Sequence, residues 1–445
     1  MRAHQRMGDW FARSEVRERS LACLEGLLSG CERKNGWQVA ECVGDGSPYG
    51  MQYLLGRARW DADRLQARLS EYVEDKLGSP DAVLILGETG FVKKGTHSAG
   101  VQRQSSGTAG RMENSQIGVF LGYAGKRGYA LLDRELYLPQ SWAEDGARRQ
   151  ATGIPDQIEF QTKPMFHPSD MDPSPGTPEL GRRMLERAFQ SGVSCGWVAG
   201  DEVYGRDSKL RRWLEARRQP YVLAVGADQR LWRQDMRRHR VDALADQLPG
   251  RAWKRLSAGH GAKGERLHDW APMPWAEGEG WEHALLVRRS LEAEPEYAFY
   301  FTYAGKKQSR LKTLAAVAGQ RWANESAFQM AKPGSPRTGL GPWGGRASAD
   351  WIITKSGIGR AGTGTSPSPC RFWPFWRCSV PGRKKLSPEK VPLSVPEIRH
   401  SIASVQRSGW HGLEHLLRWS DWRRHHQFLA RIFHFRKQQL LLFAH

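Results

Sequence analysis

The order of short apolar runs and amphipathic segments between residues 82 and 225 is the feature that most constrains the fold. Strand patterns lie at 82–86, 116–123, 129–138, 197–199 and 221–225, and an amphipathic helix pattern lies at 180–189. The run at 82–86 is continuously apolar, which is typical of a strand buried on both faces. Strands followed by alternating helix and strand predict an α/β domain built on one mixed sheet.

A chain of 445 residues is longer than one ordinary domain, and its composition changes along its length. Helical spacing predicts a helical N-terminal domain over 1–80, and the sheet pattern predicts a core whose first part is 81–226. A turn-rich stretch with strand patterns predicts a β-rich insertion over 227–310, and 311–332 reads as one long helix. The domain at 1–80 holds 12 basic and 12 acidic residues, so DNA reading and packing or dimerisation remain equal alternatives for it.

The excess of basic residues indicates a polyanionic partner. The chain has 67 Lys and Arg against 47 Asp and Glu, a formal net charge of +20. Of this, +8 lies in the basic C-terminal tail at 383–445. Binding to a polyanion releases its condensed counterions, so double-stranded DNA is the simplest partner, and a merely basic protein is the alternative.

Apolar stretches and cysteines limit the compartment. No run reaches the roughly 18 to 20 apolar residues that span a bilayer, and the start shows no secretory signal pattern. The six cysteines form no Cys-x-x-Cys pair and no zinc spacing. We therefore expect a reduced cytoplasmic chain, nucleoid-associated if it binds DNA, with no membrane partner.

Acidic residues follow two buried strands, and a third lies on the long helix. Glu88 comes soon after the run at 82–86, Asp201 follows the strand at 197–199, and Glu325 lies on the helix. Carboxylates at the ends of neighbouring strands converge on one crevice and are suitable ligands for Mg²⁺ or Mn²⁺. Arg321 and Lys332 share the helix with Glu325, which fits a metal ligand beside phosphate-binding cations; an ordinary ion pair between Arg321 and Glu325 is the alternative.

Three blocks together resemble the DDE transposases of bacterial insertion sequences. They are Glu-Thr-Gly-Phe-Val-Lys-Lys-Gly at 88–95, Gly-Asp-Glu-Val-Tyr-Gly at 200–205, and the Arg-x3-Glu-x6-Lys helix at 321–332. The resemblance implies a ribonuclease-H-like core with a β-rich insertion, and metal-dependent cleavage of DNA followed by strand transfer. It also implies that Asp201 and Glu325 are the second and third catalytic acids and metal ligands, flanked by Arg321 and Lys332.

The first acidic position departs from the family pattern. Where the resemblance places an Asp, directly before the 88–95 block, this chain has Gly87, which offers no oxygen ligand. Glu88 is adjacent, but successive residues of a strand point to opposite faces, so its use as a substitute requires a local bulge. We expect catalysis to be impaired. A non-catalytic DNA-binding remnant, a pseudogene product, and a ribonuclease-H-like nuclease outside transposition are the alternatives.

The segment at 333–382 differs in character from the rest of the chain. It holds 10 Gly and 7 Pro with a single acidic residue, and no helical or strand period is visible. Read in a shifted frame, the codons of 349–370 permit a helix-and-strand sequence resembling what the family carries after the position of Lys332. We infer a frameshift in this segment; a native Gly- and Pro-rich linker is the alternative.

Basic residues at two places are candidates for DNA contact. Lys93 and Lys94 follow the first strand block, where a solvated loop is the equal alternative. Arg423 and Arg424 lie in a tail of interleaved basic and aromatic residues, which suits contact with a DNA backbone, or packing on the core. A homodimer is compatible with the sequence but is not required by it.

Overall fold

The computed structural model describes residues 11, 13–29, 35–45, 47–58, 61–93, 95–106, 111–154, 177–233, 236–261 and 264–331. The predicted Lys94, Lys332, Arg423 and Arg424 contacts lie outside these residues, as do the segments at 333–382 and 383–445.

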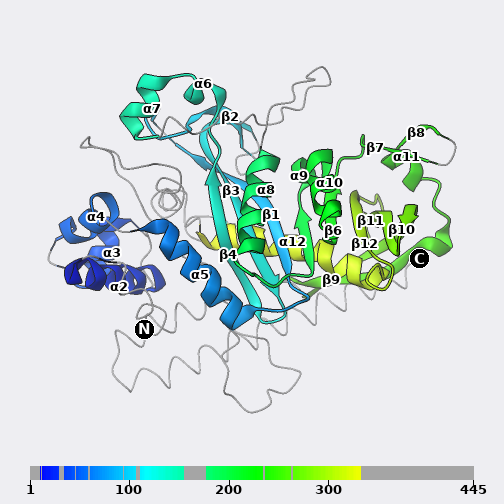
Figure 1. Cartoon of the computed structure of the whole chain (residues 1–445), viewed down its shortest axis with the longest axis horizontal. Coiled ribbons are helices and arrows are strands. Elements are labelled where there is room, and N and C mark those ends of the chain that lie inside the picture. Colours follow the sequence, from blue (N-terminus) through cyan, green and yellow to red (C-terminus); the bar gives the residue numbers. More distant parts are fainter. Residues whose placement is uncertain are drawn as a thin grey trace, which may run out of the picture.

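Among the described residues, four helices precede the sheet (Figure 1). They are α2 (Ser14–Leu28), α3 (Gly36–Cys42), α4 (Tyr49–Gly56) and α5 (Ala62–Leu77). The first three bury a small apolar core of their own, which includes Val16, Val39 and Met51. Cys23 is a free thiol whereas Cys42 is disulfide-bonded, so the expectation of a fully reduced chain is wrong at Cys42.

One mixed sheet of ten strands forms the centre of the molecule, as predicted (Figure 1). Its strands are β1 (Val83–Val92), β2 (Gln102–Ser106), β3 (Arg111–Gly125), β4 (Gly128–Leu136), β5 (Trp197–Gly200), β6 (Tyr221–Val225), β9 (Lys254–Gly261), β10 (Gly264–Gly278), β11 (Trp281–Arg289) and β12 (Tyr297–Gly305). Their order is β2-β3-β1-β5-β6-β12-β11-β10-β9, with β4 paired to β3. Among the strand pairs of the described residues, β1–β5 and β5–β6 are parallel and the others are antiparallel.

The strands of the region expected to be an insertion extend this same sheet. β12 pairs antiparallel with β6, and β11, β10 and β9 follow outward from it. A separate two-stranded ribbon, β7 (Arg230–Trp232) and β8 (Arg238–Arg240), precedes them and is followed by α11 (Val241–Ala245) and the short 3-10 helix η2 (Gly250–Ala252).

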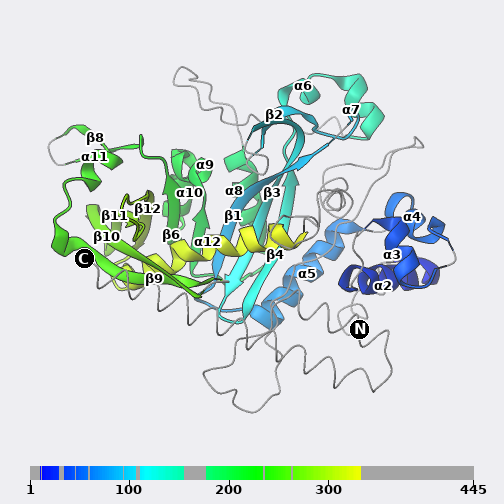
Figure 2. The same cartoon turned by 180° about the vertical axis from the view of Figure 1, so that it is seen from behind.

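Helices cover both faces of the sheet because its central strands are apolar on both sides. On one face, Leu84 and Leu86 pack in a large core with residues of α8 (Thr177–Gln190) and α10 (Ser208–Ala216). On the other face, Val83 and Ile85 pack in a second core with residues of α12 (Leu311–Ala331), which crosses the sheet (Figure 2). Two short helices, α6 (Gln140–Ala143) and α7 (Gly146–Thr152), follow β4, and α9 (Glu202–Arg206) follows β5.

The first strand is longer than its apolar run indicates. It was expected to end at residue 86, but β1 continues to Val92, and its antiparallel pairing with β3 runs without a break from Val83 to Val92. The cause is β3, whose backbone continues to provide hydrogen-bond partners beyond the apolar run. Gly87 and Glu88 therefore lie within a strand rather than after one.

Candidate active site

Asp201 lies at the carboxyl end of β5, in the centre of the sheet. The parallel pairing of β1 and β5 ends at Leu86 and Gly200, and Asp201 follows directly. Its side chain caps the N-terminus of α9 by accepting a hydrogen bond from the Val203 backbone N–H at 3.1 Å. A carboxylate cap of this kind fixes the side chain and complements the partial positive charge of the helix N-terminus.

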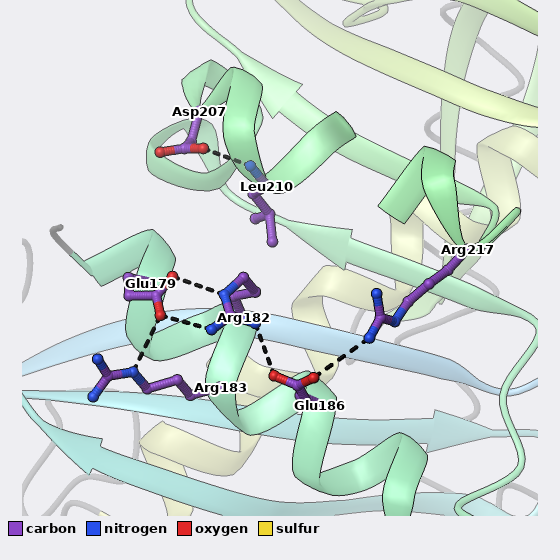
Figure 3. A network of polar contacts seen from close by, with 7 residues as sticks. All are labelled: Glu179, Arg182, Arg183, Glu186, Asp207, Leu210 and Arg217. Atoms are coloured by element: carbon purple, nitrogen blue, oxygen red, sulfur yellow. Dashed lines mark hydrogen bonds and ion pairs between the residues drawn. The ribbon is translucent and has the colours of Figure 1, made fainter. Parts of the chain in front are cut away.

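The elements around Asp201 are held by ion pairs and a second cap. Asp207 caps α10 by accepting from the Leu210 N–H at 2.6 Å (Figure 3). Arg217, which follows α10, pairs with Glu186 of α8 at 3.4 Å, and Glu186 also pairs with Arg182 at 2.8 Å (Figure 3). These contacts tie α8 and α10 together on the face of the sheet opposite α12.

Three charged side chains act on one another at this end of β5. Burial, the largest cause, and the Glu88 carboxylate together raise the pKa of Asp201 to about 6, although the Arg321 guanidinium acts in the opposite direction. Glu88 of β1 and Arg321 of α12 are therefore both within electrostatic range of Asp201, which directly follows β5.

Glu325 lies one turn along α12 from Arg321. Its carboxylate is 4.0 Å from the Arg321 guanidinium, and 52% of its side chain is exposed, so this is a weak surface ion pair. Glu325 also acts on Arg266 of β10, whose pKa burial lowers and the Glu325 carboxylate raises. Glu325 is thus an accessible carboxylate beside two arginines.

Asn324 places α12 against the strand that carries position 87. This residue is buried, and its side-chain amide donates a hydrogen bond to the Ile85 carbonyl oxygen at 2.9 Å. A Cβ built on Gly87 would lie 3.3 Å from the Asn324 amide nitrogen and 3.8 Å from a ring carbon of Phe328. Position 87 therefore faces α12, next to the residue that precedes Glu325.

Glu88 does not occupy the direction in which a side chain at position 87 would point. The β1–β3 register shows no shift between Val83 and Val92, so β1 has no bulge at Glu88. By strand alternation, Glu88 shares the face of Leu84 and Leu86, which pack toward α8. Glu88 could take the place of the first acid only through a bulge in β1, and β1 has no such bulge.

The predicted carboxylates Asp201 and Glu325 share Arg321 as a neighbouring cation, but they do not complete a metal site. Among the residues that the structure describes, no group of three His, Cys, Asp or Glu side chains is placed to hold a metal ion. Asp201 and Glu325 are two oxygen donors, and Gly87 leaves the first position of the expected set without one. The residues present do not fit a two-metal clamp.

Other predicted residues have separate outcomes. Lys93 directly follows β1, and its backbone N–H donates to the Asn114 carbonyl at 2.8 Å; its contact with DNA stays a prediction.

Four residues near the site were not identified from the sequence: Asn324, Arg266, Arg288 and Trp322. Trp322 and Asn324 lie within the Arg-x3-Glu pattern at 321–325, which was the available signal. Arg266 and Arg288 become visible only through the pairing of β10 and β11.

Comparison with known proteins gives two findings. The model of a family described as DDE superfamily endonuclease matches residues 6–273, which include Gly87 and Asp201 and end before Glu325. A probable transposase for insertion sequence element IS701 of Microchaete diplosiphon is 25% identical over 189 residues, 41% of this chain and 42% of that protein. The matched segment thus spans less than half of the relative. Together with the mixed sheet, the family match confirms the ribonuclease-H-like fold expected above.

No helix in the described ranges is both long and apolar enough to traverse a lipid bilayer.

Proposed function

We propose that this chain, which belongs to the DDE superfamily of endonucleases, is by descent an insertion-sequence transposase whose metal-dependent DNA cleavage is impaired by Gly87. Endonucleases of this superfamily generally use divalent metal ions, and we propose Mg²⁺ or Mn²⁺ for the ancestral site. The substrate would be double-stranded DNA at the ends of the element and at the target.

The observation that carries this proposal is the direction of position 87. Its Cβ would point at α12, beside Asn324 and one residue from Glu325, while Asp201 follows the strand paired with β1. An aspartate there would add a third carboxylate to Asp201 and Glu325. With glycine the set is incomplete, so we assign no cleavage step to the present chain.

The remaining residues of the site have roles that do not need the third carboxylate. The Arg321 guanidinium lowers the pKa of Asp201, which favours the charged form of this carboxylate against the effect of burial. Arg321 also lies 4.0 Å from Glu325, so the same cation acts on both the second and the third acidic position. Lys332, which lies outside the described residues, stays a predicted phosphate-binding cation.

A non-catalytic DNA-binding protein is the second candidate, and one observation favours it. The net charge of +20 remains in a chain that lacks the first acid, and electrostatic binding to phosphates depends on that charge alone. The two candidates differ in whether restoring position 87 restores a metal site.

The Gly87→Asp variant tests the proposal through metal binding. Calorimetric titration with Mn²⁺ should show no specific site in the unaltered chain and a site in Gly87→Asp that is lost again in Gly87→Asp/Asp201→Asn. Asn324 must yield by a few tenths of an ångström to admit the new Cβ.

Gly87→Asn is the matched control, since it has the shape of Asp without the charge. No gain of Mn²⁺ binding in Gly87→Asp would contradict the role of position 87. Cleavage by the unaltered chain of duplex DNA from the genomic flanks of its gene, in Mg²⁺, would contradict the impairment.

A further inference from the structure

Two arginines and a histidine surround one tryptophan on the α12 face of the sheet. The Arg266 guanidinium carbon lies 4.4 Å from the centre of the Trp322 ring, and that of Arg288 lies 5.7 Å from the same ring. The His268 ring stacks on Trp322 at 6.2 Å with an angle of 15° between the planes. We call Arg266, Arg288 and Trp322 the arginine–tryptophan cradle. It lies beside Glu325, which acts on Arg266.

The cradle carries positive charge that the protein does not neutralise by direct contact. Among the described residues, neither Arg266 nor Arg288 takes part in an ion pair, and the Nε atom of Arg288 is buried without a hydrogen-bond partner. Burial, and to a smaller extent Arg288 and Arg266, lower the pKa of His268 to about 4, so both guanidinium groups act on this half-buried ring. Two close guanidinium groups without an acceptor favour an anion from outside.

The opposite face of the same strands carries a similar cluster that is neutralised. There Arg289 lies 4.3 Å over the Trp253 ring, and Asp269 accepts hydrogen bonds from Arg255 at 2.9 Å and from Arg289 at 3.2 Å. Alternation along β10 and β11 puts Asp269 and Arg289 on one face, and His268 and Arg288 on the other. In this sheet an arginine can therefore pack on a tryptophan and still pair with a carboxylate. The lack of such a pair at Arg266 and Arg288 does not follow from the packing alone.

We propose that the arginine–tryptophan cradle binds one backbone phosphate of the DNA strand that passes Glu325. Guanidinium groups present a rigid fork of donors that matches phosphate oxygens, and the tryptophan face orients them. The inference rests on the proposed function for the identity of the anion. It adds a site formed by β10, β11 and Trp322 of α12, which orients the strand rather than taking part in chemistry.

The salt dependence of DNA binding tests this inference without any metal. The full chain is titrated with a labelled duplex of random sequence in EDTA over a range of salt concentrations. Arg266→Gln/Arg288→Gln should weaken binding by about 10-fold or more. It should also reduce the slope of log K against log salt by about 0.9, the value for one lost phosphate contact.

Two matched variants separate phosphate binding from packing. Arg255→Gln/Arg289→Gln removes the same charge from the opposite face and should leave the slope unchanged. Arg266→Lys/Arg288→Lys keeps the charge and should retain most of the salt slope even if the tryptophan contact is lost. This variant also provides a measurement if the Arg266→Gln/Arg288→Gln protein does not fold.

The outcomes are distinguishable from those of the proposed function. An unchanged slope in Arg266→Gln/Arg288→Gln, or an equal loss in the Arg255/Arg289 pair, overturns the cradle while leaving the Mn²⁺ test of Gly87→Asp intact. A complete lack of duplex binding by the unaltered chain contradicts the DNA substrate itself, and the cradle with it.

Discussion

At the scale of single residues, one buried amide sets the distance between α12 and the strands beneath it. Asn324 donates to the Ile85 carbonyl and lies over both Gly87 of β1 and Gly122 of β3. A Cβ on Gly122 would overlap the Asn324 side-chain oxygen. Glycine at 122 is therefore explained by close approach of the helix, and the same approach brings position 87 next to Glu325.

Gly122→Ala should destabilise the protein by about 1 to 3 kcal/mol, because the added methyl must displace Asn324 from its hydrogen bond. The cost should be smaller in an Asn324→Ala background, since the clashing oxygen is gone; urea unfolding of the four proteins measures this coupling. Gly56→Ala is the control, because a Cβ there meets nothing within 4 Å. Strict additivity of the two changes would refute the close approach.

At the scale of elements, the α12–β10 contact joins an apolar core to a charged rim. Trp270 and Ala318 are buried in the core under α12, whereas Arg266, His268 and Trp322 are half-buried at its edge. The His268 ring packs between the rings of Trp270 and Trp322. The histidine is held neutral there because burial and both neighbouring arginines oppose its protonation.

This environment predicts a pH dependence of stability. The folded pKa of His268 is about 4 against 6.5 for the free side chain. The neutral His268 therefore contributes its full share to the free energy of unfolding above pH 6.5. This share is lost as the pH falls through 4, because the unfolded chain binds the proton more readily than the folded protein. The loss amounts to up to about 3 kcal/mol.

Comparing the unaltered chain with His268→Gln, which does not titrate, isolates this contribution. The stability advantage of the unaltered chain over the variant should shrink between pH 7 and pH 4 in urea unfolding. A constant difference over that range would mean that His268 is protonated as easily in the folded protein as in the unfolded chain.

At the scale of the whole molecule, the order of elements was visible in the sequence, and their pairing was not. The helix expected over 311–332 is α12, Leu311–Ala331, and the amphipathic pattern at 180–189 lies within α8. Apolar periodicity reports such elements because it records which face is buried. It does not record partners, so the pairing of β12 with β6, which extends the central sheet, could not be read from it.

For the candidate site, too, single residues could be predicted from the sequence, whereas contacts between elements could not. The sequence pattern singled out Asp201, Glu325 and the glycine at the first position. In the structure Arg321 acts on Asp201 and lies 4.0 Å from Glu325, and position 87 faces α12 beside Asn324. The length of β1 was missed because Gly87 and Gly90 look like strand breaks in isolation. The cradle was missed because Arg266, Arg288 and Trp322 meet only after β10, β11 and α12 have packed.

The last prediction concerns the two separate departures of this chain from its family. Gly87 removes a carboxylate, and the segment at 333–382, which lies outside the described residues, has the composition expected of a shifted reading frame. If both are lesions, Gly87→Asp alone should gain Mn²⁺ binding without efficient cleavage, and only the variant that also carries the frame-restored segment should cut DNA from the gene's flanks. The frame-restored chain with Gly87 should stay inactive, because its metal site lacks the third carboxylate. Full cleavage by Gly87→Asp with 333–382 unaltered would show that this segment is a native linker.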